Sequence, residues 1–246
     1  IIGADGANSR VGRDLQLDSN REWIVGIEDV FSGAPLNGPP RLHCFLDRAL
    51  APGYLAWIAN DGEEVHVGVG GYPTMFEPAT ALELFRQSIG GIVDLGSGNW
   101  IERRAGRIPV GGVLRRIANN HGLLVGDAAG AVSPLTAGGL DPTMRLSTLA
   151  ADVISSYLAT NNPEALSAYS GELFRARFTS RIWMRQMMTR LNQPTLELAC
   201  LVLRLPILKL FASHVFFGRG SFPDIESKPR VEYRESSPIL WDAHTP

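Results

Sequence analysis

The residues best placed to do chemistry follow a short apolar run near the middle of the chain. Gly126-Asp127 comes directly after Leu123-Leu124-Val125, so the aspartate stands at the carboxyl end of a predicted parallel strand. Nucleotides bind at that end of the sheet in α/β folds, where a carboxylate can accept hydrogen bonds from ligand hydroxyls. The small residues at 128–131, beginning with Ala128, leave room for a bulky ligand against the backbone.

A second group of small residues precedes a predicted long helix. Pro134 shapes a rigid loop, and Gly138-Gly139 leads through Leu140 into a helix expected to run to about residue 158. Pro142 suits the first turn of that helix, because the N–H it lacks would be unpaired there. Backbone N–H groups at a helix N-terminus carry partial positive charge. The loop therefore favours a group that becomes negative, such as the N1 and O2 edge of a reduced flavin.

The first residues, 1–13, read as a short strand, a glycine turn and the start of a helix that Asn8 or Ser9 can cap. The turn holds Asp5 and Gly6, and glycine lets a ligand approach the backbone because it has no Cβ. An ordinary strand–turn–helix unit has the same pattern, so this turn alone does not establish a site. The chain opens without Met in what reads as the end of a strand, and we expect upstream sequence to precede it.

Four segments between residues 20 and 72 have the alternation of half-buried strands. Asn60-Asp61-Gly62 is a hairpin signal between the last two of them. A helix over 79–89 and a strand over 102–109 follow. The region predicts an antiparallel sheet that can form the wall of a substrate pocket; its strands are expected at 21–31, 41–46, 54–59 and 64–70.

The C-terminal third is predicted to be helical. One amphipathic helix is expected over 164–191, with Arg177, Arg181 and Arg185 in an i, i+4 stripe that we interpret as a solvated face. Residues 195–217 are very apolar, and we predict a buried helix pair there. An interfacial helix is the alternative, giving peripheral membrane contact through 175–217. From residue 218 the composition indicates a surface extension.

Composition limits the function classes. The 246 residues are 45% hydrophobic, enough for a sizeable core, and a formal net charge of -2 gives no general attraction to nucleic acid. Cys44 and Cys200 are the only cysteines and lie far apart, which predicts two reduced thiols and no metal site. No signal peptide or membrane-spanning run is visible, so we expect a cytoplasmic location, with membrane association as an alternative. No acid–base residue stands out; His43 and His66 are candidates by type alone.

Two motifs carry a family resemblance. The segment GLLVGDAAG followed by PLTAGGL and SxxAA resembles the second FAD-binding motif of the flavoprotein monooxygenase and geranylgeranyl reductase superfamily, and IIGADGANSRVGR resembles its Asp-Gly motif. The resemblance implies FAD as cofactor, with NAD(P)H as a candidate electron donor. It implies that Asp127, flanked by Gly126 and Ala128, binds the ribityl chain. The backbone of Gly138, Gly139 and Leu140 then faces the pyrimidine edge, Pro134 lies near the ring, and Asp5 and Gly6 lie near the dinucleotide.

The geranylgeranyl reductase branch fits the middle region best. Its Tyr-x-Trp-x-Phe-Pro motif, seven residues and Gly-x-Gly resemble Leu55–Asn60 followed by Gly68-Val69-Gly70. Trp57, Gly68 and Gly70 are kept, which implies a pocket for a small apolar or prenyl-type substrate. Leu55, Ala59 and Asn60 depart from the motif at positions that help line the lipid pocket, which leaves prenyl reduction open. Trp57 also fits a core aromatic residue of the sheet.

The sequence thus predicts an α/β chain, α+β overall. A partial Rossmann-like FAD-binding domain (1–19 and 106–160) carries an inserted antiparallel substrate domain (20–105) and a C-terminal helical region (161–246). We expect an FAD-dependent oxidoreductase that transfers hydride or electrons to an apolar substrate. An FAD-dependent monooxygenase and an incomplete fragment without flavin are the alternatives. No Gly-x-Gly-x-x-Gly occurs in the chain, so we expect weak FAD retention by this chain alone.

Overall fold

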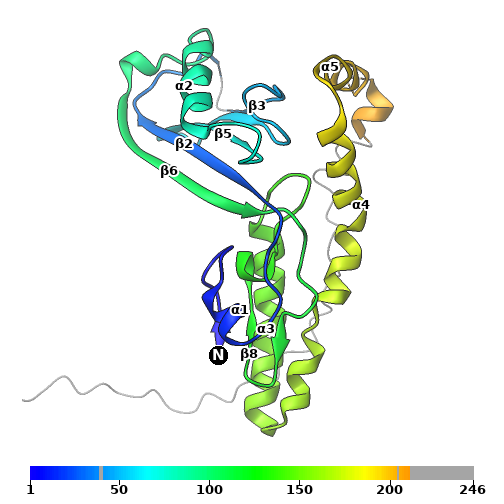
Figure 1. Cartoon of the computed structure of the whole chain (residues 1–246). Helices are drawn as coiled ribbons and strands as arrows, with labels where there is room; N and C mark the ends of the chain where they lie inside the picture. The colour runs from blue at the N-terminus through cyan, green and yellow to red at the C-terminus, as the bar shows by residue number, and fades with distance from the viewer. Residues whose placement is uncertain (39–40, 204, 211–246) are drawn as a thin grey trace, which may run out of the picture.

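The computed structural model describes residues 1–38, 41–203 and 205–210. A larger sheet with a covering helix lies at one end of the molecule and a smaller sheet with two long helices at the other (Figure 1). The strands are β1 (Ile2–Gly3), β2 (Trp23–Ser32), β3 (Leu42–Phe45), β4 (Ala56–Asn60), β5 (Glu64–Gly71), β6 (Asn99–Pro109), β7 (Ala118–Asn119) and β8 (Gly122–Leu124). The α-helices are α1 (Arg10–Asp14), α2 (Pro78–Ser88), α3 (Leu140–Thr160), α4 (Gly171–Arg190) and α5 (Gln193–Val202). The 3₁₀ helices are η1 (Leu95–Ser97), η2 (Gly126–Ala129) and η3 (Pro163–Ala168).

The larger sheet is antiparallel, with the strand order β3-β4-β5-β2-β6. Its strands confirm the segments predicted between residues 20 and 72. Alternate residues such as Ile58, Val67 and Ile27 pack under α2 with Phe85 and form one of the two cores. The hairpin between β4 and β5 turns at Gly62, whose φ of 106° suits glycine. The opposite face of the sheet carries the intervening residues, including Trp57.

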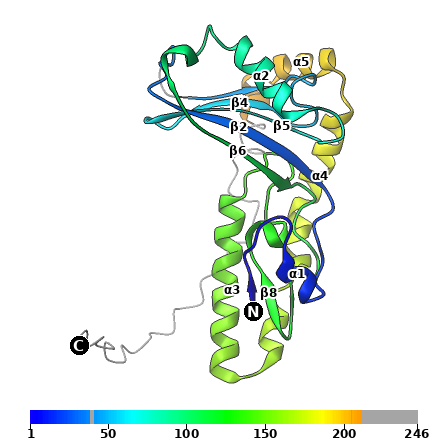
Figure 2. The same ribbon diagram turned by 60° about the vertical axis from the view of Figure 1, so that its left-hand side comes forward.

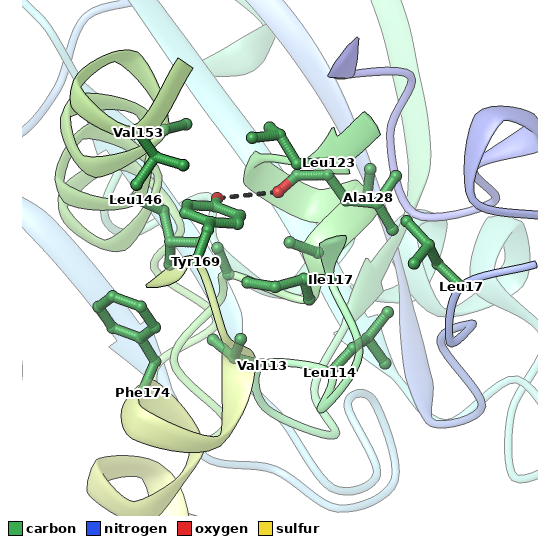
Figure 3. Packing of buried hydrophobic residues seen from close by; sticks show 14 of the residues in the cluster. Leu17, Val113, Leu114, Ile117, Leu123, Ala128, Leu146, Val153, Tyr169 and Phe174 are labelled. Atoms are coloured by element: carbon green, nitrogen blue, oxygen red, sulfur yellow. Dashed lines mark hydrogen bonds between the residues drawn. The ribbon is translucent and has the colours of Figure 1, made fainter. Parts of the chain in front are cut away.

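The smaller sheet holds the predicted parallel strand. β8 pairs in parallel with β1, with Gly3 opposite Leu124, and pairs in antiparallel with β7. The second core packs against it from α3, η3 and α4 (Figure 3). Tyr169, 2% exposed, donates its hydroxyl to Leu124 O at 2.9 Å in this core. The buried β8 thus directs the chain into the Gly126-Asp127 turn.

Helix α4 runs from the smaller sheet to the larger one, as both ribbon views show (Figures 1 and 2). Near its start Arg175 Nη1 donates to Val113 O at 3.0 Å, on the side of the smaller sheet. Just beyond its end, Gln193 Nε2 donates to Leu46 O at 3.2 Å, next to β3. The helix therefore connects the two halves of the molecule.

The C-terminal predictions need correction. The helix expected over 164–191 is broken, because Tyr169 turns into the core and Ser170 caps α4 by accepting from Glu172 N. The predicted solvated stripe is wrong at Arg185, which is 3% exposed. The burial predicted for 195–217 is wrong in α5, where Leu198 and Leu201 are more than half exposed. Residues 204 and 211–217 lie outside the described residues, as does the predicted extension from 218.

Two further predictions meet the fold at specific places. The expected domain boundary at 105/106 falls inside β6, which belongs to the larger sheet as far as Pro109; the division into domains stays a prediction. Among the described residues, no helix is long and apolar enough to cross a membrane.

Candidate functional site

Asp127 lies in the turn that leaves the smaller sheet. Gly126 begins η2 with a φ of 60°, a left-handed value that favours glycine. Burial raises the pKa of the Asp127 carboxyl above its ordinary value. Within the described part of the chain, no donor forms a hydrogen bond with that carboxylate. The carboxylate is therefore an acceptor still able to bind a ligand hydroxyl. The Ala128 side chain is packed in the core, so this residue can contact a ligand only through its backbone.

The Gly138-Gly139 pair lies beside Asp127. A Cβ built on Gly139 would lie 3.5 Å from Asp127 Oδ1, within van der Waals contact, so the backbone at Gly139 lies next to the carboxylate. Gly139 is the N-cap of α3 and no side chain caps this helix, although Leu140 and Asp141 open it. Helix N-termini with free amides attract negative groups. The structure thus brings the two predicted glycine motifs together around one carboxylate and one helix N-terminus.

The loop of residues 133–139, called the 133–139 loop below, is held in one shape by its own backbone. Ser133 N donates to Gly138 O and Ala137 N donates to Ser133 O, both at 2.9 Å. Ala137 has a φ of 54°, a left-handed conformation that is unfavourable for a residue with a Cβ. Pro134 is buried within the loop. Maintaining such a conformation requires support from the surrounding structure.

The Asp5 carboxylate forms hydrogen bonds with residues at the start of α1. Its carboxylate accepts from Ser9 Oγ at 2.6 Å, from Arg10 N at 2.7 Å and from Val11 N at 3.1 Å. Burial raises the pKa of Asp5, but these hydrogen bonds outweigh it and leave the pKa below its ordinary value. Asp5 thereby organises the start of α1. Gly6, with a φ of 80° and no atom within 4 Å of a built Cβ, leaves open space next to that turn.

Asn20 is a site-building residue that the sequence patterns did not indicate. Its Nδ2 donates to Ala7 O at 3.0 Å and to Asp127 O at 2.8 Å, and so ties the two predicted cofactor turns together. Its Oδ1 would lie 2.9 Å from a Cβ at Gly130, a residue with a φ of 70°. An isolated asparagine in a loop carries no periodic signal, so only the folded arrangement reveals this role.

Trp57 lies flat on the face of the larger sheet that is turned away from α2. A Cβ at Gly68 would overlap its indole ring, and one at Gly70 would lie 3.5 Å from Cζ3. Gly26 on the next strand is close as well, with Cη2 3.7 Å from a built Cβ. The glycines therefore make room for the indole, which places Trp57, Gly68 and Gly70 together as predicted. Their role in binding substrate stays a prediction.

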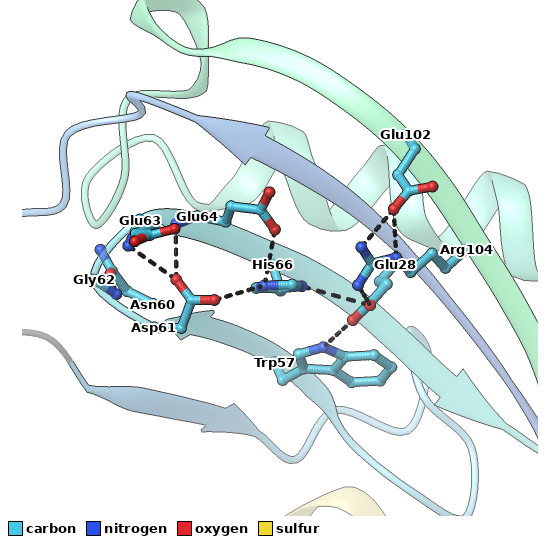
Figure 4. A network of polar contacts seen from close by, with 10 residues as sticks. All are labelled: Glu28, Trp57, Asn60, Asp61, Gly62, Glu63, Glu64, His66, Glu102 and Arg104. Carbon is cyan, nitrogen blue, oxygen red and sulfur yellow. Dashed lines mark hydrogen bonds and ion pairs between the residues drawn. The ribbon is translucent and has the colours of Figure 1, made fainter. Parts of the chain in front are cut away.

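A polar network borders Trp57 on this face (Figure 4). Trp57 Nε1 donates to Glu28 Oε2 at 3.2 Å, and His66 Nδ1 lies 3.6 Å from Glu28 Oε1. The other ring nitrogen of His66 lies 3.6 Å from Asp61 and 3.7 Å from Glu64. These last three residues are spaced closely enough to hold a cation, but Asp61 already accepts from two backbone amides of its own turn. The network positions Glu28 and thereby the indole.

Tyr54 joins the Trp57 face to the 133–139 loop. Its hydroxyl donates to Thr136 O at 2.8 Å, and its ring meets that of Trp57 edge-on, with centroids 6.5 Å apart. Burial raises the pKa of Tyr54 to about 12, so the hydroxyl stays protonated and able to donate at neutral pH. The predicted substrate face and the predicted cofactor loop are therefore adjacent.

Comparisons with known proteins identify relatives of this chain. The chain is 31% identical over 184 residues to digeranylgeranylglycerophospholipid reductase of Methanothrix thermoacetophila (69% of this chain, 44% of that protein). It is 32% identical over 169 residues to menaquinone reductase of Mycobacterium tuberculosis (63% and 41%). A solved geranylgeranyl bacteriochlorophyll reductase-like protein from Thermoplasma acidophilum has the same fold, with a TM-score of 0.67 at 24% identity (79% of this chain, 51% of that one). No protein-family model matches.

The fold is that of the solved geranylgeranyl reductase-like protein. The chain belongs to the FAD-dependent oxidoreductase superfamily that includes the geranylgeranyl reductases and the flavoprotein monooxygenases. The predicted fold class is thereby confirmed. The chain spans less than half the length of these two curated relatives.

The residues present fit the flavin end of FAD. Asp127 offers an acceptor that has no donor among the described residues, and α3 offers an N-terminus that no side chain caps. Gly138 and Gly139 add no side chain next to this carboxylate and helix N-terminus.

Proposed function

We propose that this chain forms the flavin and substrate side of an FAD-dependent reductase that acts on an apolar, prenyl-type lipid. The observation that carries the proposal is the bond from Tyr54 to Thr136 O, which joins the sheet face around Trp57 to the 133–139 loop. A substrate lying on that face would have its reacting end next to the loop that follows Asp127.

The chain's own residues bind and orient. Asp127 would hold the ribityl chain by accepting hydrogen bonds from its hydroxyls, and the amides at Gly139 and Leu140 would stabilise negative charge on the flavin. Bound FAD supplies the hydride or electron transfer. The indole of Trp57 would provide an apolar surface for the substrate, bordered by the polar network of Glu28 and His66. Asp5 and Gly6 lie at the turn that faces the dinucleotide.

The names of the relatives and the indole of Trp57 support the proposed substrate class. The curated relatives include reductases named for digeranylgeranylglycerophospholipid and for menaquinone. The departures at Leu55, Ala59 and Asn60 replace residues of the family motif without adding charge. NAD(P)H is the proposed electron donor.

The activity can be tested with the purified chain supplied with FAD. Visible absorbance of flavin bound during titration with excess FAD, lost in Asp127→Asn, supports the site. Under argon, NADPH and geranylgeraniol should give a product heavier by two hydrogens, one delivered as hydride from flavin and one as a proton from water. NADPH consumption in air with an oxygenated product would instead identify a monooxygenase. Absence of flavin binding by the chain would refute the proposal for this chain alone.

Peripheral membrane contact is the second part of the proposal. Leu198 and Leu201 lie three residues apart on α5, 59% and 58% exposed, and Ile207 beyond it is 81% exposed. Apolar side chains exposed on one helix face are typical of interfacial helices. In liposome flotation, Leu198→Glu/Leu201→Glu should abolish co-flotation. Leu158→Glu, at a 73% exposed position of α3, should not. Flotation that the double variant leaves unchanged would contradict the contact.

A further inference from the structure

Two backbone carbonyl groups of the 133–139 loop are bound by side chains from other parts of the fold. Tyr54, from the larger sheet, donates to Thr136 O at 2.8 Å. Arg185, from α4, donates through Nη1 to Pro134 O at 3.0 Å. Neither residue belongs to the two glycine motifs. The loop that precedes the N-terminus of α3 is thus held by hydrogen bonds from two different elements.

Arg185 makes three contacts in three separate segments. Besides Pro134 O, its Nη2 donates to Gly53 O at 3.0 Å and its Nε donates to Tyr72 Oη at 2.9 Å. The guanidinium also lies over the Tyr72 ring, 4.9 Å from the centroid. Tyr72 in turn donates its hydroxyl to Glu22 at 3.0 Å. The planar guanidinium group of Arg185 therefore links α4, the larger sheet and the 133–139 loop in one fixed geometry.

The electrostatics of Arg185 point to geometry as its role. The side chain is 3% exposed, and within the described part of the chain no carboxylate forms an ion pair with it. Burying a cation among neutral acceptors is unfavourable compared with an apolar side chain of similar volume. A lysine would keep the charge but would reach the three acceptors with a single ammonium group. The arrangement uses the directional N–H groups that only arginine has.

The loop needs such support, since Ala137 holds a left-handed conformation at a φ of 54°. Because Gly138 and Gly139 follow directly, a shift at Pro134 or Thr136 would move the amides at the start of α3. We infer that Arg185 and Tyr54 are positioning residues that set the conformation of the 133–139 loop and thereby align it for the flavin. The flavin part of this inference rests on the proposed function.

The hydrogen bonds from Arg185 and Tyr54 to the 133–139 loop are called the clamp below. Hydrogen exchange measured by mass spectrometry tests the clamp directly in the full chain without added flavin. In Arg185→Lys and in Tyr54→Phe, exchange in peptides covering the 133–139 loop should accelerate roughly tenfold or more, as expected for the loss of a stabilising hydrogen bond. Two matched controls should leave loop exchange at the wild-type rate. Tyr169→Phe removes a hydroxyl–carbonyl bond elsewhere in the core, and Arg190→Lys changes an exposed arginine on the same helix.

A second arm titrates each variant with FAD and records the visible spectrum. Where the wild-type chain binds FAD, the two clamp variants should bind roughly tenfold more weakly, with a shifted flavin band, and the controls should not. The inference is overturned if loop exchange keeps the wild-type rate in both Arg185→Lys and Tyr54→Phe. It is also overturned if Arg185→Lys alone keeps the wild-type rate. Faster exchange with unaltered FAD affinity and spectrum overturns its flavin part. If the wild-type chain binds no FAD, the proposed function fails for this chain, and the exchange arm alone decides the clamp.

Discussion

Replacing Gly68 by alanine tests the packing of Trp57 on the sheet. The new methyl group would overlap Cζ2 and Cε2 of the indole and would lie 2.9 Å from Glu28 Cβ, so the ring must lift off the strand. Such overpacking costs about 1–3 kcal/mol, and losing the 3.2 Å bond from Trp57 to Glu28 costs about 1 kcal/mol more. Replacing a strand glycine returns about 0.5–1 kcal/mol. The net expectation is a destabilisation of about 2 kcal/mol.

Urea unfolding followed by circular dichroism measures this change, and a thermal scan should show a midpoint lower by about 4–8 °C for a chain of this size. Gly106→Ala is the matched control. This glycine lies in β6 on the same face of the larger sheet as Gly68, with no atom within 4 Å of a built Cβ. Gly106→Ala should stabilise the chain by about 0.5–1 kcal/mol, the gain from replacing a strand glycine without a clash. In a Trp57→Ala background Gly68→Ala should cost almost nothing, giving a coupling energy of about 2 kcal/mol. Equal effects of the two glycine substitutions would refute the packing argument.

Three further predictions concern single side chains. Asp127→Asn should raise the thermal midpoint of the flavin-free chain at pH 7 while abolishing FAD binding, because a carboxyl whose pKa is raised by burial lowers stability once it is ionised; an unchanged or lower midpoint would contradict this. Asn20→Ala should destabilise by about 1–3 kcal/mol and speed hydrogen exchange in both turns that Asn20 joins, since two hydrogen bonds are lost; faster exchange in one turn only would show that it does not couple them. Asp29 is fully buried. Burial raises its pKa, but hydrogen bonds from Arg103 and Trp100 outweigh this and lower the net pKa, so its stabilisation is present above about pH 4 and is lost as the pH falls through the lowered pKa. Asp29→Asn should therefore cost about 2 kcal/mol at pH 7, the size of a hydrogen bond to a charged group, and flatten the acid limb of the stability curve, and an acid limb like that of the wild type would contradict stabilisation by the ionised Asp29.

Short-range patterns in the sequence predicted much of this architecture. Alternating apolar residues predicted four strands of the larger sheet, and the hairpin at Asn60–Gly62 is where expected. The strand before Gly126-Asp127 and the helix after Gly138-Gly139 were predicted as well. Periodicity and turn chemistry report contacts between residues a few positions apart. For that reason they predicted elements and paired motifs well.

The hydrogen bonds that connect these elements could be identified only from the tertiary structure. Tyr54 contacts a residue 82 positions away, Arg185 one 51 positions away and Asn20 one 107 positions away. The i, i+4 spacing of the arginines wrongly placed Arg185 on a solvated face, because helical spacing identifies a face but not what that face packs against. The break before α4 likewise depends on where the Tyr169 hydroxyl finds its acceptor, Leu124 O. The sequence thus determined the two glycine motifs and their order, and long-range packing determined how they are held against the larger sheet.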